Sequence, residues 1–329
     1  MRAAWYEHCG PAAEVLQVGE MEAPIPGPGD VRVRILVSAV NNHDTNQRSG
    51  RFGAAMPHPR VVPHSDGAGV VESVGEGVDP SRVGRRVWVY GAQAGGPFGT
   101  AAELAVVPSR QAVYLPDSVS DEVGACLGLP GITAHRAIYA DGPVLGKTVL
   151  VQGVLGAVGA LAAQMAKWGG ARVIGSVRRT EEVAAAEKLP KFPLNAVVAL
   201  DDPDPTGVIL AHAPDGVDRI VEVSLSANAE LDATVLKDFG VLAAYASETE
   251  RAAIPFWPMA FGNVIIRFLG SDGFPSSATA EAAEDLAAAA VDQALSLPIE
   301  DPLPLAKIVE AHDKVEAGGT GRVLVKVSS

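Results

Sequence analysis

The stretch from Val149 to Ala166 most constrains how this chain can fold. Its only polar side chains are Gln152 and Gln164, its first residues are rich in valine and its last ones in alanine. A run of this length could cross a bilayer, but within Gly153–Gly159 every third residue is glycine. We therefore predict a buried strand, a tight turn and a buried helix, in that order.

Predicted strands and helices alternate through the region that follows residue 121. Short runs rich in Val and Ile are separated by segments with helical character. Such alternation is typical of βαβ units, which build a parallel sheet with helices on both faces. Strands are predicted at 148–152, 172–177, 196–200, 219–223, 241–246 and 264–270, and helices at 125–140, 157–168, 181–188, 231–236 and 278–295.

The first third of the chain has a different pattern, because its β-branched runs are separated by turns rich in proline and glycine. This pattern predicts a β-rich domain with strands at 31–40, 67–74 and 86–90. A last strand at 322–327 is expected to return to that domain. We therefore predict two domains, one formed by residues 1–124 and 270–329 and the other by residues 125–269.

Charge and cysteine usage limit the partners. The formal net charge is -13 and no Lys/Arg cluster is present, which argues against nucleic acid or an anionic membrane as partner. The two cysteines, Cys9 and Cys126, form no Cys-x-x-Cys pattern, so neither structural zinc nor a disulfide framework is expected. The first residues lack the apolar core of a signal peptide. We therefore expect a soluble protein of the cytoplasm.

The glycine-containing turn has the features of a dinucleotide-binding loop. Glycine lets the backbone turn sharply, lets a pyrophosphate approach the amide groups and lets the helix pack close to the strand. The helix N-terminus adds unpaired N–H groups and partial positive charge. Val154 stands where the usual spacing has a second glycine. The position of the loop between a buried strand and a helix still favours dinucleotide binding over simple close packing.

The end of the next predicted strand indicates which dinucleotide binds. NAD-binding folds place a carboxylate there for the ribose 2′-hydroxyl, but this chain has Arg178 and Arg179. A guanidinium can bind a 2′-phosphate through paired, charge-assisted hydrogen bonds. We therefore predict NADPH, and prefer this interpretation to two solvated arginines near a helix start.

Short motifs follow one another in a specific order along almost the whole chain. They are Pro26–Gly29, Asn41-x-x-Asp44-Thr45, Asp66–Val71, Gly84–Val87, Gly131–Ala134, the glycine loop, Gly216–Asp218 and Gly318–Arg322. In this order they resemble the medium-chain dehydrogenase/reductase superfamily, and within it the zinc-free, zeta-crystallin-like NADPH:quinone oxidoreductases. The resemblance implies a GroES-like β-rich catalytic domain and a Rossmann nucleotide-binding domain with a doubly wound parallel sheet. It also implies a homodimer formed through edge strands of the nucleotide-binding domain.

The resemblance further implies which residues contact NADPH. Asn41 would lie near the nicotinamide, Thr133 would open the helix that faces the cofactor, and Arg322 would approach it from the last segment. The remaining contacts would come from the loop, the second strand and the later strand ends: Gly153, Leu155, Gly156, Ala157, Val158, Ser176, Arg178, Arg179, Val223, Ser224, Tyr245, Ala246, Ser247, Gly270, Ser271 and Asp272.

The places at which zinc-bearing relatives hold their metal correspond, by resemblance, to Asn41, Ser65, Asp66 and Leu129. Zinc prefers thiolate, imidazole and carboxylate ligands, and three of these four residues offer none. His43 and His64 lie nearby in sequence and leave a rearranged metal site as the alternative. We expect no metal, because two imidazoles without a third fixed ligand are more often polar pocket groups.

Residues at the expected substrate mouth depart from the family pattern. They are Asn46 and His135, each in place of a tyrosine, Phe52, an aromatic residue without a hydroxyl, and His64 in place of a glycine. Leu200 departs from the family pattern at the end of the cofactor site where the adenine is expected. The substrate mouth is therefore the part of the site that the resemblance defines least.

Without a Lewis acid, hydride transfer needs an acceptor that is already electrophilic. The first hypothesis is an NADPH:quinone reductase. The alternatives are an NADPH-dependent reductase of the C=C bond of α,β-unsaturated carbonyls, and a non-catalytic NADPH-binding protein. Asn41 and Asn46 are the predicted hydrogen-bond donors to a developing oxyanion. His43, His64 and His135 are the predicted proton donors.

Other residues have plainer interpretations. Asp44 and Arg48 have the i,i+4 spacing of a local ion pair. Cys126 is predicted to be a small buried helix residue. His312 is interpreted as a surface or structural residue. Phe256, Trp257 and Phe261 could line a substrate cleft, but interdomain or subunit packing is preferred.

Overall fold

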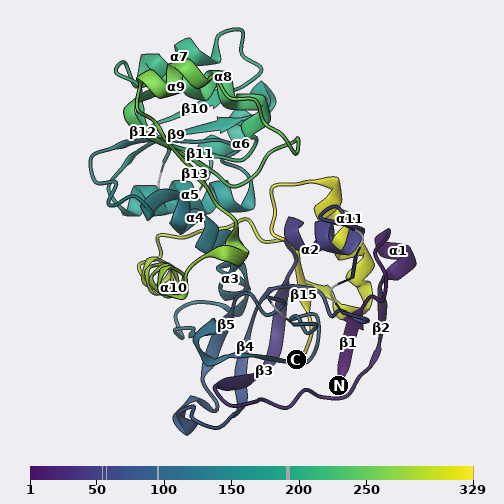
Figure 1. Cartoon of the computed structure of the whole chain (residues 1–329). Coiled ribbons are helices and arrows are strands. Elements are labelled where there is room, and N and C mark those ends of the chain that lie inside the picture. The colour runs from purple at the N-terminus through teal and green to yellow at the C-terminus, as the bar shows by residue number, and fades with distance from the viewer. Residues whose placement is uncertain (54, 57, 95, 190–192, 329) are drawn as a thin grey trace. The chain divides into compact units, whose positions relative to one another are not determined.

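The structure is a computed structural model that describes residues 1–53, 55–56, 58–94, 96–189 and 193–328. It divides into two compact units, Met1–Pro130 with Leu297–Ser329, and Gly131–Ser296 (Figure 1). The boundary differs from the predicted one, because residues 270–296 belong to the second unit. Helix α10 (Ser276–Val291) packs there against α4 (Leu129–Tyr139), where His135 Nε2 lies 2.8 Å from Asp285 Oδ2.

The first unit is built on a seven-stranded sheet. Strands β3 (Asp30–Ala39), β4 (Asp66–Val74), β5 (Arg86–Val89) and β7 (Ala112–Tyr114) follow one another in antiparallel pairs. β6 (Leu104–Pro108) pairs with β3, and β15 (Leu324–Lys326) pairs with the other end of β3. The C-terminal segment therefore returns to the first sheet, as predicted, and ends beside β14 (Leu303–Pro304).

The remaining elements of the first unit lie around this sheet. β1 (Arg2–Trp5) and β2 (Gln17–Glu20) form a two-stranded antiparallel sheet. The helices are α1 (Ala12–Val15), α2 (Asn42–Ser49), α3 (Asp121–Cys126) and α11 (Ile308–Ala317). Cys126 is buried in α3, as predicted. The predicted helix 125–140 is in fact two helices, α3 and α4.

The second unit contains a six-stranded parallel sheet. Its strand order is β10-β9-β8-β11-β12-β13, the doubly wound order predicted for a dinucleotide-binding fold. The strands are β8 (Thr148–Val151), β9 (Arg172–Val177), β10 (Ala196–Ala199), β11 (Val217–Glu222), β12 (Leu236–Ala244) and β13 (Ile265–Phe268). The connecting helices are α5 (Ala157–Trp168), α6 (Val183–Glu187), α7 (Pro205–His212), α8 (Leu225–Val235) and α9 (Phe256–Phe261).

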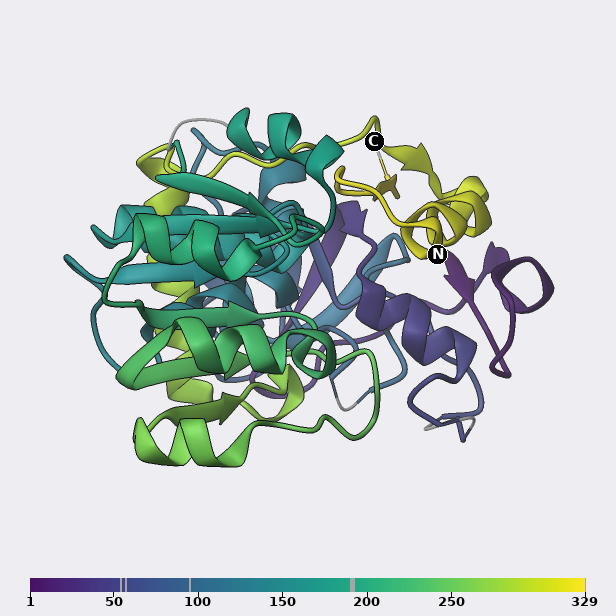
Figure 2. The same cartoon turned by 90° about the horizontal axis from the view of Figure 1, so that it is seen from above.

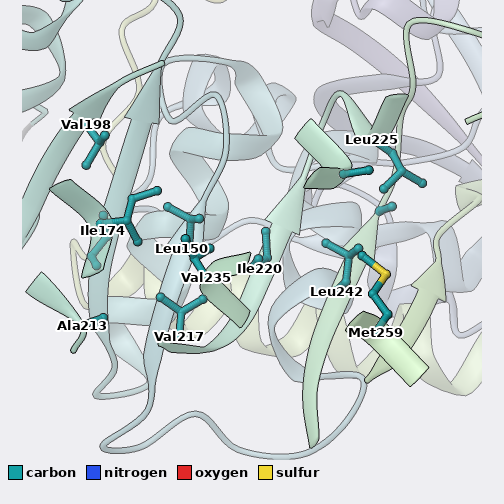
Figure 3. Close-up of a cluster of buried hydrophobic side chains, with 13 residues drawn as sticks. Leu150, Ile174, Val198, Ala213, Val217, Ile220, Leu225, Val235, Leu242 and Met259 are labelled. Atoms are coloured by element: carbon teal, nitrogen blue, oxygen red, sulfur yellow. The ribbon is translucent and has the colours of Figure 1, made fainter. Parts of the chain in front are cut away.

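Helices cover both faces of this sheet (Figure 1, Figure 2). On one face, inward side chains of the strands, among them Leu150, Ile220 and Leu242, pack against α7, α8 and Met259 of α9 (Figure 3). Burial of such side chains contributes roughly 1.5–3 kcal/mol each. Because the sheet has both faces covered, the central strand β8 has an apolar run rather than an alternating pattern.

Two predicted boundaries in this unit were wrong. α8 begins at Leu225, not at 231, and β12 begins directly after it at Leu236. No helix among the described residues is long and apolar enough to cross a membrane, and the stretch 149–166 is the predicted strand, turn and helix.

Candidate functional site

The turn after β8 has the close approach that its glycines predict. Gly153 has a φ of +66°. A Cβ at Gly159 would lie 2.2 Å from the Gly153 carbonyl oxygen, so α5 can approach the turn only if residue 159 is glycine. Gly156 is the N-cap of α5 and supplies no side-chain cap. The first N–H groups of α5, at Ala157 and Val158, are thus available to a phosphate.

Ser176 has a different position from the predicted one. We expected it beside the adenosine phosphate, but its side chain is fully buried. Its hydroxyl donates to Gln152 Oε1 and accepts the Gly153 N–H at 3.2 Å. Because both partners lie inside the fold, Ser176 supports the glycine turn from below instead of presenting a hydroxyl at the surface.

The two arginines after β9 are exposed. The side chains of Arg178 and Arg179 are 82% and 61% accessible. Glu182 accepts both of their backbone N–H groups, at 3.0 and 3.2 Å, and its carboxylate lies 3.8 Å from each guanidinium. Exposed ion pairs of this kind contribute about 0–1 kcal/mol. The guanidinium groups can therefore turn to a phosphate at little cost.

The later predicted cofactor contacts lie at strand ends and in loops of the second unit. Val223 and Ser224 follow β11, and the Tyr245 N–H donates to the Glu222 carbonyl at 3.0 Å. Thr133 is buried in α4. The other contacts are exposed or half-buried in loops and the short helix after β13: Ala246, Ser247, Gly270, Ser271 and Asp272.

In the first unit, three of the four zinc-ligand places meet at one carboxylate oxygen. Asp66 Oδ2 accepts Asn41 Nδ2 and the Leu129 N–H, each at 2.7 Å. Arg322 Nη2 donates to Asn41 Oδ1 at 2.7 Å, which joins the C-terminal segment to α2. Asn41 also caps α2 and donates its N–H to Asp44 Oδ2 at 2.7 Å. The side chains of Asn41, Asp44, Asp66 and Arg322 form the Asn41 network.

Burial decides the charge of the two acids in the Asn41 network. Desolvation raises the pKa of Asp66 to about 6, although the Asn41 and Leu129 hydrogen bonds and Arg322 oppose the change. Desolvation, with the negative charge of Asp66, raises the pKa of Asp44 to about 8. At neutral pH the network therefore contains one carboxylate, Asp66, beside a largely protonated Asp44 and the cationic Arg322.

The donor set of the Asn41 network does not suit zinc. Asn41 Oδ1 is bound to a guanidinium, so a fixed positive charge lies beside the oxygen that a metal would need. Among the described residues, no group of three or more His, Cys, Asp or Glu side chains could hold a metal ion. His43 and His64, the alternative ligands, do not come together, since His64 is bound to Ser38 and His312.

The ion pair expected between Asp44 and Arg48 is absent. Asp44 caps its own helix, whereas buried Arg48 donates to the Gly10 carbonyl and to Glu316 of α11. The i,i+4 spacing was overridden because a carboxylate at the third position of a helix can accept the N-cap N–H.

The predicted proton donors are scattered. His43 lies on α2 with its ring centroid 5.3 Å from that of exposed Phe52. Asn46 is half-buried on the same helix. His64 and His135 are fully buried, and desolvation lowers the pKa of each. Of the three histidines, His43 alone is partly exposed.

Sequence reasoning missed the importance of several buried acids. Asp44 and Asp66 were interpreted only through motifs, and Glu222 with Asp232 were not considered. Gln152 was a usable signal, because a lone amide inside an apolar strand and turn needs a buried partner.

The comparisons with known proteins agree with this architecture. Residues 27–117 match the family model of the alcohol dehydrogenase GroES-like domain. A Pseudomonas aeruginosa quinone oxidoreductase is 36% identical over 176 residues, which is 53% of this chain and 52% of that protein. The first three curated relatives are thus matched over about half their length. Human quinone oxidoreductase is 30% identical over 97% of this chain and 95% of its own length.

The chain belongs to the quinone-oxidoreductase-like medium-chain dehydrogenase/reductases. The structure of a mycobacterial protein complexed with NADPH also superposes with a TM-score of 0.82, at 24% identity and 99% coverage of both chains. For this medium-chain reductase, the predicted combination of a GroES-like domain and a Rossmann domain is confirmed.

Proposed function

We propose that this medium-chain reductase is an NADPH-dependent oxidoreductase that reduces quinones without a metal ion. The Asn41 network carries the proposal, because only Asp66 among the four zinc-ligand positions offers a zinc ligand, and the Asn41 amide oxygen is bound to the Arg322 guanidinium. The relatives named quinone oxidoreductase and the NADPH-bound structural neighbour support it.

The residues of the second unit fit NADPH. Gly159 lets α5 pack against the glycine turn, because a Cβ there would lie 2.2 Å from the Gly153 carbonyl oxygen, and the start of α5 offers N–H groups to the pyrophosphate. Arg178 and Arg179 supply cations for the 2′-phosphate. When bound, NADPH supplies the hydride.

The chain's own residues would orient and stabilise the acceptor. Asn41 is held rigidly, since its amide nitrogen and oxygen each have a partner at 2.7 Å. Preorganised donors of this kind stabilise a developing oxyanion without rearranging. Asn46 and His43, on the same helix, are the proposed substrate-facing donor and proton source.

An absorbance assay tests this function. Purified protein is mixed with NADPH and, separately, with naphthoquinones, phenanthrenequinone, crotonaldehyde and simple alcohols, before and after exhaustive chelation. We expect NADPH oxidation with quinones that chelation leaves unchanged. Turnover with crotonaldehyde alone would favour the C=C reductase, and tight NADPH binding with no oxidation in any assay would leave a binding protein. Loss of activity on chelation would refute the metal-free mechanism.

We also propose that the protein is a homodimer joined along β13. β13 is the end strand of its sheet, and apolar side chains around it are exposed. They are Phe256 at 61%, Trp257 at 65%, Phe261 at 77%, Ile265 at 47% and Phe268 at 71%. An unpaired edge beside such a patch favours pairing with a second copy. Light scattering should give twice the 33.9 kDa chain mass, and Trp257→Glu should shift it toward the monomer.

A further inference from the structure

Two carboxyl groups lie buried beneath the glycine turn of the second unit. Glu222 ends β11 and Asp232 lies on α8, and the side chains of both have no exposed surface. Asn228, one turn before Asp232 on α8, donates to the Glu222 carboxylate, which brings the two acids close together. Two adjacent buried carboxylates repel each other, so one of them takes up a proton. The pair therefore holds one proton at neutral pH.

The neighbouring donors decide which acid holds that proton. Glu222 accepts the Ser224 N–H, and Asn228 Nδ2 lies 3.1 Å from both of its oxygens. Asp232 Oδ1 accepts Gln152 Nε2 at 3.0 Å, whereas buried Oδ2 has no hydrogen-bond partner. Glu222, which has the donors, is therefore the carboxylate, and the proton lies on Asp232 Oδ2. Consistent with this, desolvation and the charge of Glu222 raise the pKa of Asp232 to about 9.

A directed chain of hydrogen bonds runs from Asp232 to the turn. Gln152 gives its amide N–H to Asp232, so its Oε1 faces Ser176 and accepts the Ser176 hydroxyl proton. The free lone pair of Ser176 Oγ then accepts the Gly153 N–H at 3.2 Å. Reversing any one member would place two donors or two acceptors face to face.

We propose that Asp232 is a positioning residue for the NADPH-binding turn, and that the proton it shares with Glu222 sets, through Gln152 and Ser176, the orientation of the Gly153 peptide. The expected effect on NADPH affinity rests on the proposed function. The orientation of the Gly153 peptide does not. Loss of the shared proton leaves two adjacent buried carboxylates that repel each other, which loosens α8 from the turn.

One further titratable group faces the pair. Tyr245, at the end of β12, has its pKa raised by burial and by the charge of Glu222. It therefore ionises only after Asp232. The glycine turn should accordingly respond to pH in one step, at the pH where Asp232 loses its proton.

The sequence allows that step to be observed at one atom. Gln152–Gly153 is the only Gln–Gly pair in the chain. Protein labelled with ¹³C-carbonyl glutamine and ¹⁵N-glycine therefore gives a single correlated amide signal, that of Gly153. Its chemical shift is followed in the nucleotide-free protein from pH 6 to pH 10, in the wild type and in Asp232→Asn. The asparagine side chain of this variant would keep an acceptor for Gln152 Nε2 but cannot ionise. Asp215→Asn, an exposed acid before β11, is the matched control.

We expect a step centred on about pH 9 in the wild type and in the control, and none in Asp232→Asn. If Asp232→Asn does not fold, Glu222→Gln should move the step to lower pH, because the repelling charge is gone. A wild-type shift that does not change with pH, or a step that survives in Asp232→Asn, would overturn the inference.

Nucleotide affinity gives the second readout. At pH 7, the Kd for NADPH should stay within about twofold in Asp232→Asn and rise about tenfold in Asp232→Leu, as expected for loss of a buried hydrogen-bond network. Unchanged affinity in Asp232→Leu would contradict a positioning role. A Gly153 step in a wild-type protein that binds no NADPH would refute the proposed function alone.

Discussion

His64 Nε2 and His312 Nε2 lie 3.0 Å apart in the interior of the first unit. Neither side chain has any exposed surface. Thr100 donates its hydroxyl proton to the Asp66 carbonyl at 2.6 Å, so Ser38 donates to Thr100 and must accept from His64 Nδ1. His64 is therefore the Nδ1–H tautomer and accepts at Nε2 the proton of His312 Nε2–H.

This pair explains an unusual residue in the chain. His64 has a φ of 75°, in the left-handed region where a side chain costs about 1–2 kcal/mol. The resemblance leads us to expect glycine at this position. The two ring hydrogen bonds offset the backbone strain and join the loop before β4 to α11.

The first prediction concerns stability in acid. Desolvation lowers the pKa of His64 well below its ordinary value and, with the charge of Arg48, lowers that of His312 to about 3. Below pH 6.5 the unfolded chain binds protons that the folded protein does not. Stability should therefore be complete above that pH and fall as the pH drops toward 3, by at most about 1.4 kcal/mol per pH unit for each histidine.

Urea unfolding from pH 7.5 to pH 4 measures this slope. His312→Asn should reduce it, while replacement of an exposed histidine, His8→Asn, should leave it unchanged. If His312→Asn has the same slope as the wild type, the histidine pair does not contribute to the loss of stability in acid.

A second prediction concerns stability at alkaline pH. Asp44 has its pKa raised to about 8 by burial and by Asp66. Its folded form keeps a proton that the unfolded chain releases near pH 4. The protonated Asp44 carboxyl therefore contributes to the free energy of unfolding at low pH, and this contribution is lost as the pH rises through 8. Asp44→Asn, which keeps an acceptor for the Asn41 N–H, should unfold at higher urea concentration than the wild type at pH 9; equal midpoints there would contradict the assigned shift.

Arg322 gives a third prediction. Replacing it with leucine removes the donor to Asn41 Oδ1 and the cation that lowers the pKa of Asp66. We expect a loss of about 2–3 kcal/mol in the free energy of unfolding at pH 7, since a buried charge-assisted hydrogen bond is broken. Lys326→Leu, which removes an exposed cation of β15, is the control. Equal stability of the two variants would show that the Arg322 hydrogen bond to Asn41 does not stabilise the fold.

The fourth prediction tests the phosphate contacts. Arg178→Ala with Arg179→Ala should raise the Kd for NADPH at least about a hundredfold and leave that for NADH unchanged, since each of the two charge-assisted contacts contributes about 1.5–3 kcal/mol. Arg172→Ala, at the opposite end of β9, should change neither. Calorimetry measures both ligands, and a parallel loss for NADH would indicate a fold defect instead of a lost phosphate contact.

The fold was accessible from the sequence because its signals are local. Glycines at every third position between an apolar strand and an alanine-rich helix permit few arrangements, and the parallel sheet with helices on both faces followed from the βαβ alternation. Boundaries were less certain, as α8 shows, because its N-terminus carries no side-chain cap that the sequence would reveal.

In the candidate site, too, only those positions that depend on local sequence could be predicted. The glycine loop directly follows β8, and Arg178 and Arg179 directly follow β9, so their positions at two strand ends could be predicted. Ser176 could not be placed correctly, because whether a hydroxyl at a strand end faces solvent or Gln152 depends on the neighbouring strand.

By itself, the sequence determined the two domain types, and it predicted the dinucleotide loop and the absence of a zinc site, since each depends on residue type and short spacing. Only the tertiary structure decided which buried polar groups meet. Asn41 reaches Arg322, His64 reaches His312 and Gln152 reaches Asp232 across 80 to 281 residues. Burial then sets the protonation of the acids and histidines, because the cost of a charge depends on the surroundings that the whole fold creates.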